Sequence, residues 1–501
     1  MPARSYWLAV GWLTLCVTLV FGATFANQWT YDDFPLIVEN TDIRSLVNFF
    51  ADTRPGRPLR ELSYMIDFKL FGLEPAGYHL QNILWHLGNG ILVLTLLLRL
   101  NVQRWLAIGG ASVFLLHPLQ VEVVASLAHR KDSLALFFVL SALLLFLRGR
   151  QASSKKLIWF AGAFVAWSAA FFAKQHAFML PLVLLFWGLC SCEERQDRHL
   201  RGKRTAVVAA LGAGLVFVIW VTGHYLGGAE AFLHTAAGQL QRIGYFESNI
   251  LEAHYLLVIK SALLIWSKVV LPVGLAVEYT PEVPAGWFDP WVVGSVVVAL
   301  AGGYAVWRWR RHPLIVSGAG WALLFWLPTS NLWPLSYYAA DRYMYTPMVG
   351  CVLLLVGFVQ GVPRKYFERI TLPVGSLLLL VFAVASWQQS SYWRTEETLW
   401  ARAYQVNPDS PFAINNMGMI HVRNNELDKA YVLFRDCVER IQSNPTCHYN
   451  LGWYYEATGN PSEALRHYRN FLAFREPVFA EERKRLRQRL RMNYGVNLEG
   501  D

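Results

Sequence analysis

Long apolar runs alternate with short polar connections along most of the chain. A helix needs about 20 apolar residues to cross the hydrocarbon core of a bilayer, and about eleven runs approach that length by their hydropathy. They are Tyr6–Ala26, Tyr78–Leu100, Trp105–Leu116 with its flanks, Ser133–Leu147, Leu157–Ala173, His176–Cys190, Thr205–Tyr225, Trp291–Trp309, Pro313–Leu327, Tyr343–Gln360 and Thr371–Trp387. The pattern predicts an all-α protein built on a polytopic bundle of about eleven spanning helices.

After Trp387 the pattern becomes that of a soluble helical domain. Small, aromatic and amide residues recur 34 positions apart in the pairs Gly418/Gly452, Ala430/Ala464, Phe434/Tyr468 and Asn416/Asn450. This is the period of a tetratricopeptide repeat, in which small residues lie where paired helices touch. A partial unit, Thr398–Pro408, precedes two full repeats. Since a free-standing array needs about three repeats, we expect this α-solenoid to lean on the membrane domain.

These patterns divide the chain into three parts. Residues 1–390 form the membrane domain, 391–475 the repeat domain and 476–501 a charged helix and tail with a solvated face. Long polar connections collect on one side of the membrane domain, at 27–77, 117–132, 227–290 and 330–342. We expect the chemistry of the protein on that side.

Basic residues set the expected orientation. They gather in four connections: Arg148 to Lys156, Arg195 to Arg204, Arg308 to Arg311 and Arg364 to Arg369. Placing all four in the cytoplasm puts the N-terminus inside, with Tyr6–Ala26 as a signal anchor, and the repeats outside. This works only if Tyr255–Leu271, which contains Lys260 and Lys268, is interfacial or re-entrant rather than spanning.

Composition agrees with a membrane protein. Hydrophobic residues make up 54% of the 501 positions and charged residues 16%, whereas soluble domains contain about 25% charged residues. The net charge of +10 does not indicate nucleic-acid binding, because much of it lies in the basic connections. Six cysteines form no disulfide framework, but Cys437 and Cys447 can pair if the repeats face an oxidising compartment.

An acidic pair, Asp32 and Asp33, follows the first span. Two adjacent carboxylates near a membrane need either water or a function. One of them can act as a general base that deprotonates an acceptor hydroxyl, with Asp33 as the first choice. The alternative is a turn or helix cap, since Asp favours both. No metal site is expected at the pair.

Several cations lie on the same outer side as the acidic pair, although basic residues are normally enriched in cytoplasmic connections. Arg130 and Lys131 precede one span, Lys174 lies at a turn between two others, and Arg342 begins a later one. Such a group suits an anionic phosphate, which arginine binds with two hydrogen bonds and lysine as a point charge. A local ion-pair network with Glu122 and Asp132 is the alternative, and Arg342 can also reach lipid headgroups.

A polar stripe runs along one face of the second span. His79, Asn82, His86 and Asn89 are spaced by three, four and three residues, so they share a face that must point to protein or water. We expect His86 and Asn89 to join helices by hydrogen bonds. His79 and Asn82, nearer the outer side, are candidate site residues, as is Arg57 in the first outer loop.

The ordered motifs resemble a known family. The motifs YDDFPLIVEN, RPL, GYHLQNILWHLGN, HPLQVEVVASLAHRKDSLA, AKQHA and DRYMYTPMVG, followed by 34-residue repeats, are similar to those of the transmembrane and tetratricopeptide repeat-containing O-mannosyltransferases and their prokaryotic relatives. These are GT-C glycosyltransferases, which use polyprenyl-phosphate sugars on the outer or lumenal face. The resemblance implies that Asp32 and Asp33 are the acidic pair of that superfamily and that Arg130 and Arg342 hold the lipid phosphate. Lys174-Gln175 departs from the Lys-Glu associated with this position.

The function that this resemblance implies is transfer of a sugar, with mannose by analogy, from a polyprenyl phosphate to a hydroxyl acceptor, such as a protein serine or threonine. We expect an inverting displacement by an aspartate base without a cofactor, in a bacterial inner membrane or the endoplasmic reticulum. The partners are then the lipid-linked donor and an acceptor protein or glycan engaged by the repeats. The alternative is a non-catalytic membrane scaffold or assembly factor whose repeats are the functional part.

Overall fold

The computed structural model describes residues 3–51, 57–191, 228–242, 249–335, 337–440, 444–474 and 480–495. Within these ranges the chain is helical and has no β-strand, so the all-α prediction is confirmed. The helices of the N-terminal half are α1 (Ala3–Phe21), α2 (Leu46–Ala51), α3 (Pro58–Phe71), α4 (Pro75–Arg99), α5 (Arg104–Leu116), α6 (Val121–Ala125), α7 (Arg130–Gln151), α8 (Lys156–Ala173), α9 (Met179–Ser191) and α11 (Gly228–Arg242). Those that follow are α12 (Ile250–Val270), α13 (Pro290–Arg308), α14 (Pro313–Trp326), α15 (Pro347–Gln360), α16 (Arg364–Tyr366), α17 (Leu372–Ser391), α18 (Glu396–Val406), α19 (Pro411–Arg423), α20 (Leu427–Arg440), α21 (Pro445–Ala457), α22 (Pro461–Ala473) and α23 (Ala480–Tyr494).

In the described part, seven helices are long and apolar enough to cross a membrane, or eight if α5 and α6, bent by 51°, form one span. Six of the seven match predicted spans, and the seventh is α12. The predicted spans on α5, α9, α14 and α15 are shorter apolar helices, and Thr205–Tyr225 lies outside the described residues. The chain is therefore a multi-pass membrane protein, with fewer long helices described than the sequence predicts.

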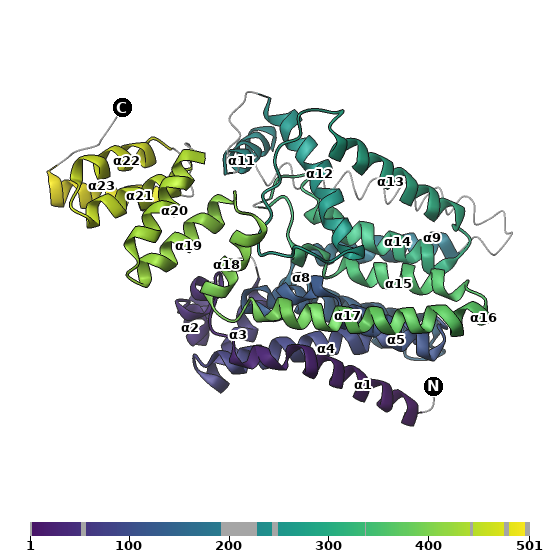
Figure 1. Cartoon of the computed structure of the whole chain (residues 1–501). Helices are drawn as coiled ribbons and strands as arrows, with labels where there is room; N and C mark the ends of the chain where they lie inside the picture. Colours follow the sequence, from purple (N-terminus) through teal and green to yellow (C-terminus); the bar gives the residue numbers. More distant parts are fainter. Residues whose placement is uncertain are drawn as a thin grey trace.

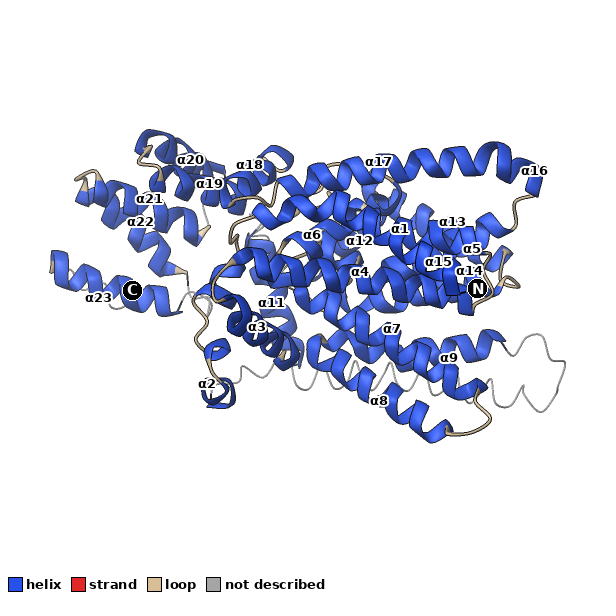
Figure 2. Cartoon of the chain, turned by 90° about the horizontal axis from the view of Figure 1, so that it is seen from below, coloured by secondary structure: helices blue, strands red, loops and turns tan. Residues whose placement is uncertain are grey.

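The N-terminus and three of the basic connections, 148–156, 308–311 and 364–369, lie at one end of the bundle. The fourth, Arg195 to Arg204, lies outside the described residues. The hydroxyl of Tyr6 on α1 lies 3.0 Å from that of Thr95, near the end of α4. At this same end the ring of Trp309, after α13, packs on Phe358 of α15. Figures 1 and 2 show the repeat domain at the opposite end from the N-terminus. The arrangement agrees with the predicted topology, while the compartment that each end faces stays a prediction.

Helix α12 contains nearly all of Tyr255–Leu271, the segment that the sequence predicts to be interfacial or re-entrant. Near its start, His254 bonds to the Tyr338 hydroxyl at 2.9 Å and to the Asn331 carbonyl at 3.0 Å. Near its end, the Val269 carbonyl lies 3.0 Å from a ring nitrogen of His117. Asn331, Tyr338 and His117 all belong to connections at the repeat-domain end. Both ends of α12 thus contact one end of the bundle, as an interfacial helix would, although its length and composition also permit a crossing.

Small residues allow α14 and α15 to touch backbone to backbone. A Cβ atom on Gly318 would lie 2.7 Å from the Gly350 carbonyl oxygen, so neither glycine can carry a larger side chain without moving a helix. Close approach through small residues is a common way to associate helices in a bilayer, where burial of apolar surface contributes little.

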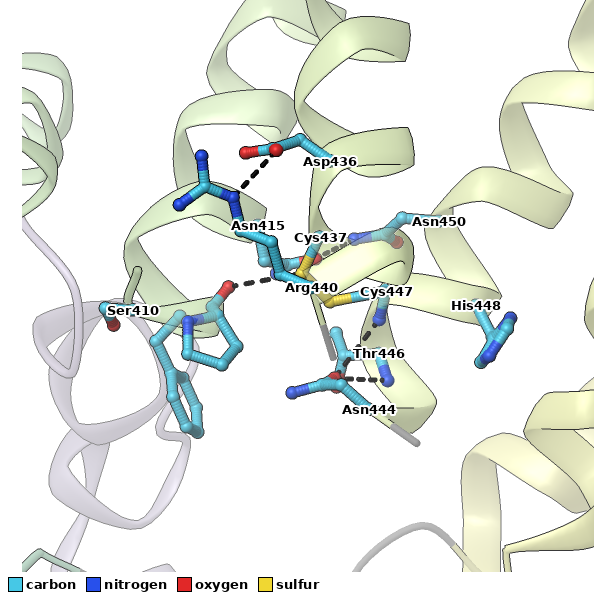
Figure 3. The surroundings of a disulfide bond; sticks show 12 residues. Ser410, Asn415, Asp436, Cys437, Arg440, Asn444, Thr446, Cys447, His448 and Asn450 are labelled. Atoms are coloured by element: carbon cyan, nitrogen blue, oxygen red, sulfur yellow. Dashed lines mark hydrogen bonds and ion pairs between the residues drawn. A yellow bond between two sulfur atoms is a disulfide. The ribbon is translucent and has the colours of Figure 1, made fainter. Parts of the chain in front are cut away.

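Two helical hairpins, α19–α20 and α21–α22, carry the two predicted repeats (Figure 1). Gly418 lies against the ring of Phe434, and Gly452 against Tyr468, in equivalent places. Figure 3 shows the disulfide between Cys437 on α20 and Cys447 on α21, which joins the first hairpin to the second. The pairing that the sequence left open is therefore present, and both cysteines are buried.

The first helix of the repeat domain, α18, packs on the membrane domain. Trp393, Leu399, Trp400 and Ala403 are buried in one apolar core with residues of α1, α4, α5 and α17. The Asn407 amide, just after α18, donates to the Glu278 carbonyl at 2.7 Å. The repeats lean on the bundle through this helix, as their small number led us to expect.

Candidate active site

The acidic pair lies where the first outer loop meets the N-terminal end of α7. Asp33 precedes a π-helical turn, Phe34–Val38, and is fully buried. One of its carboxylate oxygens accepts a hydrogen bond from the backbone N–H of Ala128 at 2.8 Å. The other accepts bonds from the backbone N–H and the hydroxyl of Thr30, at 3.1 and 3.4 Å. Asp33 therefore ties the loop to the segment that leads into α7.

Burial also changes the ionisation of Asp33. Loss of solvent raises its pKa to about 7, even though the hydrogen bonds from Thr30 and Ala128 act in the opposite direction. The nearby charge of Asp32 adds to the increase. Asp33 thus changes charge near neutral pH, where ordinary aspartates are fully ionised.

Asp32 has the opposite surroundings. It is half-buried, and in the described ranges no hydrogen bond or ion pair engages its carboxylate. Its charge acts on the phenol of Tyr337, which places the carboxylate towards the loop before Arg342. The structure thus separates the pair into a buried anchor and an accessible carboxylate.

The residue before the pair has an unusual backbone conformation. Tyr31 has a φ of +50°, in the left-handed region, which costs an L-residue with a side chain roughly 1–2 kcal/mol. The other described non-glycine residues with positive φ are three asparagines and a lysine. Strain of this kind persists only where surrounding contacts impose it, and it is often found at functional sites.

Five cations form one cluster, which reaches the acidic pair through Tyr337: Arg57, Arg60, Lys131, Lys174 and Arg342. Burial lowers the pKa of Arg57, and the charges of Arg60 and Arg342 lower it further. Burial likewise lowers the pKa of Lys174. The charge of its partner Asp132 raises that pKa, and the charges of Arg57 and Arg342 lower it. These mutual effects show that the charges lie close together.

Carboxylates neutralise only part of this cluster. Lys174 pairs with Asp132 at 2.5 Å, Arg60 pairs with Glu61, and Glu122 binds both the guanidinium and the backbone N–H of Arg342, at 2.5 and 2.7 Å. The neighbouring Asp341 accepts a hydrogen bond from Tyr279 at 2.6 Å, and burial with the Glu122 charge raises the pKa of Asp341 well above its usual range.

Arg57 and Lys131 are the two unpaired members of the cluster. Within the part of the chain that the structure describes, neither side chain has a carboxylate partner. The charges of Arg57, Asp132 and Lys174 all act on Lys131, so it belongs to the same cluster. The site therefore combines two unneutralised positive charges with one accessible carboxylate.

Tyr337 connects the acidic pair with the cations. Its hydroxyl lies 2.5 Å from the hydroxyl of Tyr31. The guanidinium carbon of Arg342 lies 5.0 Å from the centre of its ring, within the range of a cation–π contact. Neither tyrosine stood out in the sequence, although Tyr31 borders the acidic pair and Tyr337 lies in the loop that leads to Arg342.

The predicted phosphate ligand Arg130 is turned into the protein. It is fully buried and pairs with Asp67 of α3. Its remaining guanidinium nitrogens donate to the Asn82 side chain at 2.7 Å and to the Tyr78 carbonyl at 2.9 Å, and Tyr64 covers its face at 4.9 Å. Each of its three guanidinium nitrogens thus has an internal partner, which speaks against a contact of Arg130 with the phosphate, and that role stays a prediction.

The polar stripe on α4 is mostly structural. The Asn82 amide also donates to the Val124 and Ser126 carbonyls, which leaves no polar atom for a substrate. His86 bonds to the Leu115 carbonyl of α5 at 3.1 Å, and Asn89 donates to the Ser133 carbonyl of α7 at 2.9 Å, so their predicted role in joining helices is confirmed. His79 is buried and neither ring nitrogen has a hydrogen-bond partner.

In the described ranges, no group of three or more His, Cys, Asp or Glu side chains could hold a metal ion. A reaction without a metal cofactor stays a prediction.

Comparisons with known proteins agree with the resemblance drawn from the motifs. No model of a known protein family matches the chain. The protein O-mannosyl-transferase Tmtc3 of Drosophila melanogaster is 25% identical over 90% of this chain and 57% of its own length. Human protein O-mannosyl-transferases TMTC3 and TMTC4 are 20% and 23% identical over 90% and 89% of this chain, and 54% and 64% of theirs.

Among solved structures, that of ArnT from Cupriavidus metallidurans bound to undecaprenyl phosphate matches with a TM-score of 0.38 and 13% identity, over 93% of this chain and 78% of that one. This chain spans little more than half the length of the Tmtc3 proteins it matches. It is a distant relative of the protein O-mannosyl-transferases that carry the TMTC names.

Proposed function

We propose that the protein is a GT-C-type glycosyltransferase that moves a sugar from a polyprenyl phosphate to a hydroxyl acceptor. The observation that carries this proposal is the pairing of an accessible carboxylate, Asp32, with two positive charges, Arg57 and Lys131, that have no protein counter-ion in the described ranges. A buried or half-buried cation without a carboxylate is costly, so an anionic ligand is the natural partner. The names of the relatives support mannose as the sugar and protein as the acceptor.

In this mechanism Asp32 is the base, in place of the first choice Asp33. The Asp32 carboxylate takes the proton of the acceptor hydroxyl as that oxygen forms a bond to the anomeric carbon. The bond from the anomeric carbon to the phosphate oxygen breaks, and its electron pair leaves on the phosphate. Arg57, Lys131 and Arg342 stabilise the negative charge that develops there. One displacement with inversion completes the transfer.

The site then lies on the extracytoplasmic or lumenal face. The disulfide of the repeat domain supports this placement, because such bonds persist in oxidising compartments. The repeats lie at the same end of the bundle as the site (Figure 1), where they can present an acceptor protein to it.

Arg57→Gln and Lys131→Gln are each expected to weaken binding of a polyprenyl phosphate by roughly 10- to 100-fold, the usual value of a charge-assisted contact. The measurement is the Kd of undecaprenyl phosphate in detergent or nanodiscs. Lys69→Gln is the matched control, because Lys69 is an exposed cation at the end of α3. Equal affinity for all three variants and the parent protein would show that this cluster does not bind the phosphate.

Transfer should require ionised Asp33. The backbone N–H groups of Thr30 and Ala128 donate to the two carboxylate oxygens and so favour the anion. A proton on either oxygen would point at one of these donors and weaken its hydrogen bond. Since the pKa is raised to about 7, the anion is lost as the pH falls through that value. We expect kcat to fall about tenfold per pH unit below about 7.

The pH profile of Asp33→Asn provides the control. This variant should be slow but independent of pH over the same range, because no proton is exchanged at position 33. A wild-type profile that stays flat down to the range of an ordinary aspartate, about pH 4, would contradict the role assigned to Asp33.

A further inference from the structure

Tyr31 is held by two aromatic residues that are remote in the sequence. The Trp400 ring lies 5.3 Å from the Tyr31 ring, nearly perpendicular to it at 83°. The Tyr337 hydroxyl lies 2.5 Å from that of Tyr31. Because Tyr337 lies in the membrane domain and Trp400 on α18, the position of Tyr31 depends on both.

Helix α18 is fastened at both ends to the membrane domain. The backbone N–H of Gln28, three residues before Tyr31 in the same loop, donates to the Arg394 carbonyl at 2.9 Å. Thr395 and Thr398 form a capping box at the start of α18, in which each hydroxyl accepts a hydrogen bond from the backbone N–H of the other residue. At the other end, Asn407 bonds to the Glu278 carbonyl. Trp400 is 2% exposed between these attachments, so it is a fixed support.

The direction of the acidic pair follows from Tyr31. Its left-handed backbone is followed by hydrogen bonds from the N–H of Phe34 to the Tyr31 carbonyl and from the N–H of Leu36 to the Asp32 carbonyl, at 3.4 and 3.3 Å. This tight turn directs Asp33 inward and leaves Asp32 accessible. A bulky residue leaves the left-handed region when nothing holds it there.

We propose that α18, through Trp400 and Tyr31, positions the loop that carries Asp32. The assignment of a catalytic role to Asp32 rests on the proposed function, whereas the support of the loop by Trp400 can be tested without it. By sequence α18 is the partial unit before the repeats, but by its contacts it packs on the membrane domain and on Tyr31 of the loop that carries the acidic pair. Trp400 is a positioning residue, because it acts through Tyr31 and not on the substrate.

Amide hydrogen exchange of the full-length protein tests the support directly. Trp400→Ala should speed exchange of the Asp33, Phe34 and Leu36 amides by about tenfold or more, because local opening then needs less free energy. Phe434→Ala is the matched control, since Phe434 is a buried aromatic residue of α20 that packs on Gly418. Unchanged exchange in Trp400→Ala, or an equal increase in Phe434→Ala, would overturn the proposal.

Kinetics with a short hydroxyl acceptor, which does not need the repeats, give the second test. Trp400→Ala should lower kcat by about 10- to 100-fold, as expected for a misplaced catalytic group, with the donor KM unchanged and partial recovery in Trp400→Phe. Tyr31→Ala should have a similar effect. The double variant should be no slower than the slower single variant, because both act through one contact. Additive losses, or a normal kcat in Trp400→Ala, would refute the positioning role.

The two proposals fail in different ways. If wild type and Asp32→Asn alike transfer no sugar, the proposed function is wrong, and the exchange measurement still decides whether α18 supports the loop. If wild type is active, Asp32→Asn is inactive and Trp400→Ala is normal, only the positioning role is lost.

Discussion

Asp32→Asn is expected to lower kcat for sugar transfer by about 10²- to 10⁴-fold, the contribution of a positioned general base. The amide has nearly the shape of the carboxylate but cannot take the proton of the acceptor hydroxyl. The donor KM should change little, because in the proposed mechanism the cations and not Asp32 hold the phosphate. Transfer from a polyprenyl-phosphate sugar to a short hydroxyl acceptor is the measurement.

Two variants in the same loop make this result specific. Glu39→Gln removes an exposed carboxylate six residues after Asp33 and should leave kcat unchanged. Asp33→Asn should lower kcat through the anchor to Thr30 and Ala128 and should also increase hydrogen exchange of the loop, which Asp32→Asn should not. Transfer that persists in a correctly folded Asp32→Asn protein would exclude Asp32 as the base.

The convergence of the site could be predicted because spanning helices alternate in direction. Every second connection therefore lies on the same side of the membrane. This brings the connections that carry Asp32, Glu122, Lys174 and Arg342 to one end of the bundle, although some three hundred residues separate the first from the last. The polar residues that join α4 to its neighbours were also predictable, since an amide or imidazole deep in a span must find a partner.

The sequence could not tell which of two adjacent residues turns to partners inside the protein. Arg130 and Lys131 are neighbours in the first turn of α7 and project about 100° apart around the helix axis. Arg130 turns to Asp67 on α3, a helix of the first outer loop whose docking no hydropathy pattern reveals. The same limit applies to Asp32 and Asp33, of which only Asp33 is buried and accepts a hydrogen bond from Ala128.

The boundary between the membrane domain and the repeat domain also differs from what the sequence pattern indicates. The change of pattern after Trp387 predicts that the membrane domain ends near residue 390. The structure buries Trp393 and Trp400 with the membrane domain, so a cut there also removes Trp400, the proposed support of the loop that carries Asp32. Loss of activity on truncation would therefore not identify a scaffold, and single substitutions on α18 are the sharper test.

Asp67→Ala is expected to reduce the free energy of unfolding by about 3–5 kcal/mol, the usual result of removing one member of a buried ion pair. Arg130 is fully buried and Asp67 is 1% exposed, so water cannot replace the lost partner. The bonds from Arg130 to Asn82 and to the Tyr78 carbonyl hold α4 and α7 together, and they would be strained by the unpaired charge. Thermal unfolding of the purified protein in detergent measures the effect.

Removing both charges distinguishes a structural Arg130 from a phosphate ligand. The double variant Asp67→Leu with Arg130→Met should recover most of the lost stability, because a buried pair replaced by apolar residues of similar size is often neutral or better. It should also bind undecaprenyl phosphate with nearly the parental Kd, in contrast to Lys131→Gln. A stable double variant that no longer binds the lipid would return Arg130 to the phosphate, and the cluster of Arg57 and Lys131 would then be only part of the site.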